Sequence, residues 1–160
     1  MARVESGKSR VDLYYEDVAI GDEFDTAAHK VTKADIKAFA DATRDHHPLH
    51  TDEAHCRRIG FPGVIAHGLY GVSLIEGLKA EMKLYENTSV ASLGWDKVRF
   101  VKPIHADDTV HARVKFAAKR ESKKPDRGVV TEAIQLINQR GEVVTEGEHV
   151  TLVLRRPAGA

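Results

Sequence analysis

An aspartate and a histidine five residues apart are the strongest candidates for chemistry in this chain. Asp45 and His50 lie in the stretch Asp-His-His-Pro-Leu-His. Pro48 fixes its own φ angle and biases His47 away from helix, so we expect a bent loop to carry the pair. Such a loop can direct a carboxylate and an imidazole at one water molecule, which is the arrangement that general acid–base catalysis requires.

A second stretch, Gly60-Phe61-Pro62-Gly63-Val64-Ile65-Ala66-His67-Gly68, precedes a long apolar segment. Apolar residues at helical spacing predict a helix from about His67 to Tyr85, and the small number of charges before Lys79 indicates that it is buried. The N–H groups at the start of a helix attract negative charge. The N–H of Gly68 is therefore a candidate donor to an oxyanion.

Two further patterns predict the helix and the strands that would hold these residues in place. Thr32 and Asp35 form a capping pair that predicts a helix from Thr32 to Arg44, which would present Asp45 at its end. From Ser89 onward the period changes to two, and this predicts an antiparallel meander of four strands, near Ala91–Lys102, Thr109–Arg120, Gly128–Asn138 and Glu142–Leu154. We expect an α+β fold in which the curved sheet wraps around the one long apolar helix.

Composition narrows the class of protein. A chain of 160 residues fits one domain, 1–160, with a loose N-terminal tail at about 1–10. Lys and Arg together number 24, as do Asp and Glu, so no overall field attracts nucleic acid or an anionic membrane. The polar start of the chain, the single Cys56 and the absence of a long apolar run lead us to expect a soluble cytoplasmic protein.

Several motifs together resemble the MaoC-like dehydratases, or (R)-specific enoyl-CoA hydratases. They are the lead-in Tyr15–Asp22, the loop Asp45-x-x-Pro48-x-His50-x-Asp52, the Gly60-Phe61 step, Ala66-His67-Gly68 and Arg99-Phe100-x-x-Pro103-Ile104. The resemblance covers nearly the whole chain. It implies a hot-dog fold, an antiparallel sheet around a long helix, usually in a dimer, that acts on a 2-enoyl thioester of coenzyme A.

The resemblance also implies roles for individual residues. Asp45 and His50 would be the acid–base pair for reversible hydration of the enoyl group, and Gly68 the oxyanion donor. Residues expected to contact the substrate are His47, Ala66, His67 and Leu69. The family usually has Asn at the position of His47, which puts the substrate range in question. No metal and no cofactor is expected apart from the coenzyme A of the substrate, and the expected partner is a second copy of the chain.

Other interpretations of the same residues stay open. The fold also suits a thioesterase or a non-catalytic protein that binds acyl thioesters. Asp45 and His50 could serve only to stabilise the loop, and His67 and Gly68 only to pack the helix start. A metal cluster could form from His46, His47, His50 and His55. The basic run Lys119, Arg120, Lys123, Lys124 and Arg127 is either a solvated hairpin tip or a binding site for the phosphates of coenzyme A.

Overall fold

A computed structural model describes residues 10–159, which form five helices and six strands. The helices are the 3-10 helix η1 (Tyr15–Asp17), α1 (Lys33–Thr43), α2 (Pro48–Thr51), α3 (Glu53–Arg58) and α4 (Gly68–Glu81). The strands are β1 (Glu23–Asp25), β2 (His29–Lys30), β3 (Ser89–Phe100), β4 (Thr109–Glu121), β5 (Arg127–Asn138) and β6 (Val143–Leu154). None of the helices within this range is long and apolar enough to cross a membrane.

The strands form one antiparallel sheet in the order β1-β4-β5-β6-β3, with β2 also paired to β4. The four long strands lie where the alternating pattern predicts them. The predicted meander through all four is wrong, because β3 pairs with β6 at the far edge and not with β4. Residues 101–108 form a connection that contains Pro103 and is too long for a tight hairpin, and it carries the chain across to the other side of the sheet.

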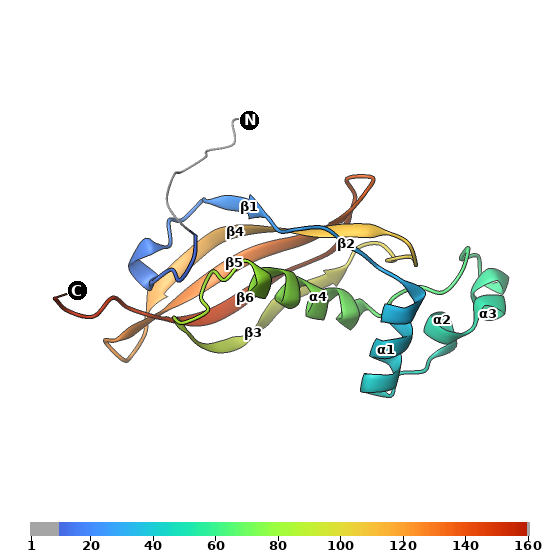
Figure 1. The fold of residues 1–160 in the computed structure, drawn as a ribbon, viewed down its shortest axis with the longest axis horizontal. Coiled ribbons are helices and arrows are strands. Elements are labelled where there is room, and N and C mark those ends of the chain that lie inside the picture. The colour runs from blue at the N-terminus through green and yellow to red at the C-terminus, as the bar shows by residue number, and fades with distance from the viewer. Residues whose placement is uncertain (1–9, 160) are drawn as a thin grey trace.

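Helix α4 lies along one face of the sheet, as predicted (Figure 1). It buries Tyr70, Gly71, Ile75 and Leu78 against the core, together with Lys79. Gly71 allows close contact, since a Cβ there would lie 3.0 Å from both Ile104 Cδ1 and Thr145 Oγ1. The helix ends at Glu81 and not at the predicted Tyr85, because Lys83 adopts a left-handed φ of 56° that an α-helix cannot contain.

Helix α1 has the predicted N-terminus. The Thr32 hydroxyl accepts a hydrogen bond from the Asp35 N–H at 3.1 Å, and the Asp35 carboxylate accepts one from the Thr32 N–H at 2.9 Å. The helix packs Ile36 and Ala40 into the core and ends at Arg44. Arg44 takes a left-handed conformation, with φ 67°, which turns the chain sharply before Asp45.

The sequence pattern does not predict the short helices and strands. The loop expected to carry His50 contains α2 and α3, whose starts are capped by His47 and Asp52. The N-terminal part of the described chain contains η1, β1 and β2, which the sequence pattern does not delimit. Helices of four to six residues give too few turns for a periodic signal. The expected loose tail falls, apart from Arg10, outside the described residues. Helices α1 to α3 gather beyond one end of α4 (Figure 1).

Removal of the N-cap of α1 tests how firmly this cluster of helices is held. We expect Thr32→Ala to lower the free energy of unfolding by about 1 kcal/mol, since the Asp35 N–H loses the hydroxyl that accepts its hydrogen bond. Thr32→Ser keeps the hydroxyl and serves as the control. Thermal unfolding at fixed protein concentration measures both variants, and the expected decrease for alanine is ~2–4 °C. Equal midpoints for the two variants would contradict the capping role.

Candidate active site

Asp45 is placed by the end of α1. It follows the left-handed Arg44 directly, and its Oδ1 accepts a hydrogen bond from the His47 N–H at 3.2 Å. The carboxylate is exposed to solvent. The turn therefore holds the side chain at a fixed place without burying its charge.

His50 lies on α2, where Pro48 occupies the first helical turn. Its Nδ1–H donates to the backbone carbonyl of Ile65 at 2.7 Å, and the Ile65 N–H donates to the carbonyl of Leu49 at 3.0 Å. A carbonyl can only accept, so neutral His50 carries its proton on Nδ1 and leaves the lone pair of Nε2 as an acceptor. Partial burial, together with the nearby His67, lowers the pKa of His50 below its usual 6.5.

His67 joins this pair from the start of α4. It is buried, and its Nε2–H donates to the backbone carbonyl of Asp45 at 2.8 Å. Its ring stacks on His50 with centroids 3.7 Å apart and an interplanar angle of 25°. The remaining nitrogen, Nδ1, is buried and has no hydrogen-bond partner within residues 10–159. His67 thus links Asp45 to His50 and offers a further acceptor.

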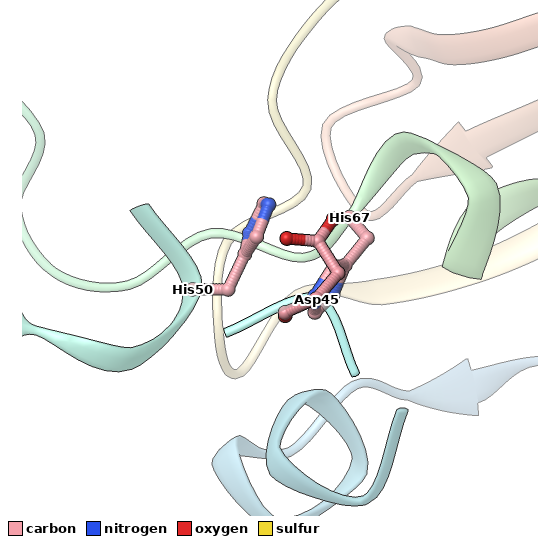
Figure 2. Close-up of side chains that lie close together, drawn as sticks. All are labelled: Asp45, His50 and His67. Carbon is pink, nitrogen blue, oxygen red and sulfur yellow. The ribbon is translucent and has the colours of Figure 1, made fainter. Parts of the chain in front are cut away.

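Asp45, His50 and His67 form one group (Figure 2). One carboxylate oxygen and one nitrogen of each ring all lie within 4.8 Å of one another. Each hydrogen bond spans about 2.8 Å, so a single water molecule can contact more than one of these atoms. The same spacing is compatible with a metal ion, held by one nitrogen from each ring and the carboxylate.

The metal cluster of neighbouring histidines that the sequence suggested does not form. His46 pairs with Asp41 at 3.0 Å, and His47 accepts a hydrogen bond from the Leu49 N–H. Neither residue joins the group, and nor does His55. Within residues 10–159, Asp45, His50 and His67 are the only such group with the spacing of metal ligands. His67 was missed as its third member because it is distant in sequence from Asp45.

Gly68 begins α4, and no side chain of the described residues caps the start of this helix. The N–H groups of its first turn therefore point to a region where an anion would be favoured. A Cβ at Gly68 would lie 2.7 Å from ring atoms of Phe100, so glycine also has a packing reason to be here. The packing role thus follows from the structure, and the role of Gly68 as an oxyanion donor stays a prediction.

A cavity of about 260 Å³ lies beside the group. Its lining includes His50, Ala66, Gly68, Phe100 and Thr145. Of the residues expected to contact a substrate, Ala66 lines this cavity, whereas His67 is buried behind His50 and His47 caps α2. Leu69 is 64% exposed and does not line it. Phe100 and Thr145 were missed because they come from distant strands.

Two other candidates from the sequence have structural roles. Cys56 is fully buried, and its thiol contacts the carbonyl of Leu49 at 3.2 Å. Burial raises the pKa of this thiol, which makes it a poor nucleophile. In the basic run, the Lys119 ammonium donates to the carbonyls of Tyr15 and Val18, and so it holds the lead-in segment against β4.

The other basic residues of the run gather around a pocket. Arg120, Lys123, Lys124 and Arg127 line a space of about 410 Å³ at the β4–β5 hairpin. Arg127 is paired with Asp126 at 2.7 Å. A role of these residues in binding the phosphates of coenzyme A stays a prediction.

Residues 16–136 match the family model of the MaoC like domain. The uncharacterised protein YdeM of Bacillus subtilis is 30% identical over 140 residues, which cover 88% of this chain and 98% of YdeM. The (R)-specific enoyl-CoA hydratase of Aeromonas caviae is 32% identical over 117 residues, covering 73% of this chain and 82% of the hydratase. Relatives differ in length, and the match spans only 33% of the protein MaoC of Klebsiella aerogenes.

Solved structures agree with this assignment. The MaoC-like dehydratase of Rhodospirillum rubrum has a TM-score of 0.81 at 35% identity, covering 91% of this chain and 99% of that one. The Mycobacterium tuberculosis protein Rv0216, described as a double hotdog fold, has a TM-score of 0.81 at 21% identity, covering 93% of this chain and 46% of that one. The predicted hot-dog fold is confirmed, and the chain belongs to the MaoC-like dehydratase family.

Proposed function

We propose that this protein catalyses the reversible hydration of a 2-enoyl-CoA thioester to a 3-hydroxyacyl-CoA. The observation that carries the proposal is the hydrogen bond from His50 Nδ1–H to the Ile65 carbonyl, which leaves Nε2 as a base beside the Asp45 carboxylate. The hydratase from Aeromonas caviae supports the reaction type by its similarity to this chain. The lowered pKa of His50 keeps the imidazole neutral at pH 7.

In the proposed reaction, a water molecule lies between the Asp45 carboxylate and His50 Nε2. Nε2 accepts one proton of the water as its oxygen bonds to C3 of the enoyl group, and Asp45 orients the second proton. Electrons move from the C2–C3 double bond towards the thioester oxygen, which gains negative charge. The N–H groups at the start of α4, with that of Gly68 first, stabilise this enolate. The acid–base pair then returns a proton to C2, so that one water has been added.

Two other activities of the same fold remain to be separated from hydration. A thioesterase would direct the water at the thioester carbonyl and release free coenzyme A, and a binding protein would do neither. Incubation with crotonyl-CoA distinguishes them: hydration removes enoyl absorbance without release of thiol. Excess EDTA in the assay tests the expected independence from metal, and loss of activity on chelation would assign a metal to Asp45, His50 and His67.

Substitution of the acid–base pair is the direct test of the mechanism. We expect Asp45→Asn and His50→Gln each to reduce turnover by ~10²–10⁴-fold with little effect on the fold, because both changes nearly preserve shape. His46→Gln is the matched control, since His46 is exposed and lies outside the group of three. Circular dichroism of every variant monitors folding. Activity near that of the control in either variant would remove that residue from the mechanism.

The lowered pKa of His50 predicts the pH dependence. The neutral ring is the base, so kcat/KM should fall as the pH decreases through the pKa of His50 in the free enzyme. Since that pKa lies below 6.5, the acidic limb of the profile should have its midpoint below pH 6.5. A midpoint above pH 6.5 would contradict His50 as the base in this environment.

We also propose that two copies pair through β3. Within residues 10–159, β3 has a hydrogen-bonded neighbour only in β6, and it exposes Val90 and Leu93. An unpaired strand edge with apolar side chains is a favourable site for association. Light scattering should give at least twice the 17.7 kDa of one chain. An active protein that stays monomeric at assay concentrations would exclude this pairing as a requirement for function.

A further inference from the structure

The inner face of β6 connects the catalytic cavity to a second pocket. Thr145, Gly147 and His149 follow one another on this face, and all three are buried. Thr145 lines the cavity beside His50, whereas His149 lines a separate pocket of about 330 Å³. Four residues of strand separate them, which is about 13 Å.

Helix α4 runs beside this part of β6. Its Gly71 packs on Thr145, and eight residues later the Lys79 ammonium lies 2.9 Å from His149 Nδ1. Helix α4 and strand β6 therefore run side by side from the catalytic cavity to the second pocket. An acyl chain that extends inward from a thioester at Gly68 would follow this path.

Trp95 stands on the path between the two pockets. Its ring atoms lie 3.1 and 3.2 Å from where a Cβ at Gly147 would be, so the ring occupies the space over the residue between Thr145 and His149. The indole N–H donates to Glu76 Oε1 of α4 at 3.0 Å. Strand β3 pairs irregularly on both sides of Trp95, where Gly94 has φ 145° and Lys97 has φ 54°.

The space behind Trp95 is charged. Lys79 forms an ion pair with the fully buried Glu132, and His149 contacts Glu132 Oε2 at 3.2 Å and Glu76 Oε1 at 3.2 Å. The Tyr85 hydroxyl and Glu132 Oε1 are buried without a hydrogen-bond partner among the described residues. An alkyl chain placed here would separate these polar groups without replacing their interactions, which is unfavourable.

From this arrangement we infer that Trp95, backed by the cluster Lys79, Glu132 and His149, limits the enzyme to short-chain 2-enoyl thioesters of about four carbons. The inference rests on the hydratase function proposed above and specifies its substrate class. In an open apolar pocket each added methylene would improve binding about fourfold. Here the indole blocks the added carbons, and the charges behind it disfavour its displacement.

Chain-length profiles of the whole protein test the inference. We expect the wild type to have a kcat/KM for trans-2-octenoyl-CoA at least about tenfold below that for crotonyl-CoA. Trp95→Ala should reduce this difference by about tenfold or more, because it opens the path over Gly147. Trp95→Phe, which retains a smaller ring but loses the hydrogen bond to Glu76, should fall between the wild type and Trp95→Ala. Glu76→Ala, at a partly exposed residue, removes the acceptor of the indole N–H and should shift the preference in the direction of Trp95→Ala.

Calorimetric binding of butanoyl-CoA and octanoyl-CoA gives a second readout that needs no turnover. Preferential binding of butanoyl-CoA by a protein that hydrates neither enoyl-CoA would support the inference and reject the proposed function. Equal hydration of crotonyl-CoA and octenoyl-CoA by the wild type would support the function and overturn the inference. If Trp95→Ala does not fold, the chain-length profiles of the wild type and of Glu76→Ala test the role of Trp95 instead. A Glu76→Ala profile equal to that of the wild type would overturn that role. Failure to bind either acyl-CoA also overturns it.

Discussion

Two hydrogen bonds from histidine rings to distant backbone carbonyls hold the candidate active site together. His50 is bound to Ile65 and His67 to Asp45, across 15 and 22 residues of sequence. Because a carbonyl oxygen accepts only, each bond fixes both the orientation and the tautomer of its ring. The end of α1, helix α2 and the start of α4 are thereby tied at one place, and the reactive nitrogen of His50 is defined by the backbone of another segment.

Features that depend on residues close together in the sequence could be predicted, whereas features that depend on residues far apart could not. Thr32 and Asp35 are three residues apart, so the start of α1 could be read directly, and the alternation in β4, β5 and β6 likewise depends on neighbours along the strand. The partner of β3 depends on how the chain crosses the sheet, which no local pattern contains. Asp45 and His50 could be named from their spacing and the family resemblance, but the contribution of His67 required the stacked geometry. Their catalytic roles remain proposals.

The ion pair of Lys79 with Glu132 is the least expected feature of the core. Helical periodicity places Lys79 on the face that also carries Ile75 and Leu78, where an apolar residue would ordinarily be found. Its partner is 53 residues away on the central part of the sheet, so no local pattern indicates that the charge is compensated. Loss of either partner would leave a buried charge, which typically costs ~3–5 kcal/mol, so the two positions are energetically coupled.

Trp95 is carried by β3, which is an edge strand within the described part of the chain. Edge strands open more readily than central ones, because fewer backbone hydrogen bonds and less buried surface hold them. The proposed limit on acyl-chain length thus depends on a side chain of one of the less tightly held strands of the sheet. A second copy paired along β3 would restrict the motion of that strand. Association of the two chains would then be thermodynamically linked to the difference in affinity between short and long acyl chains.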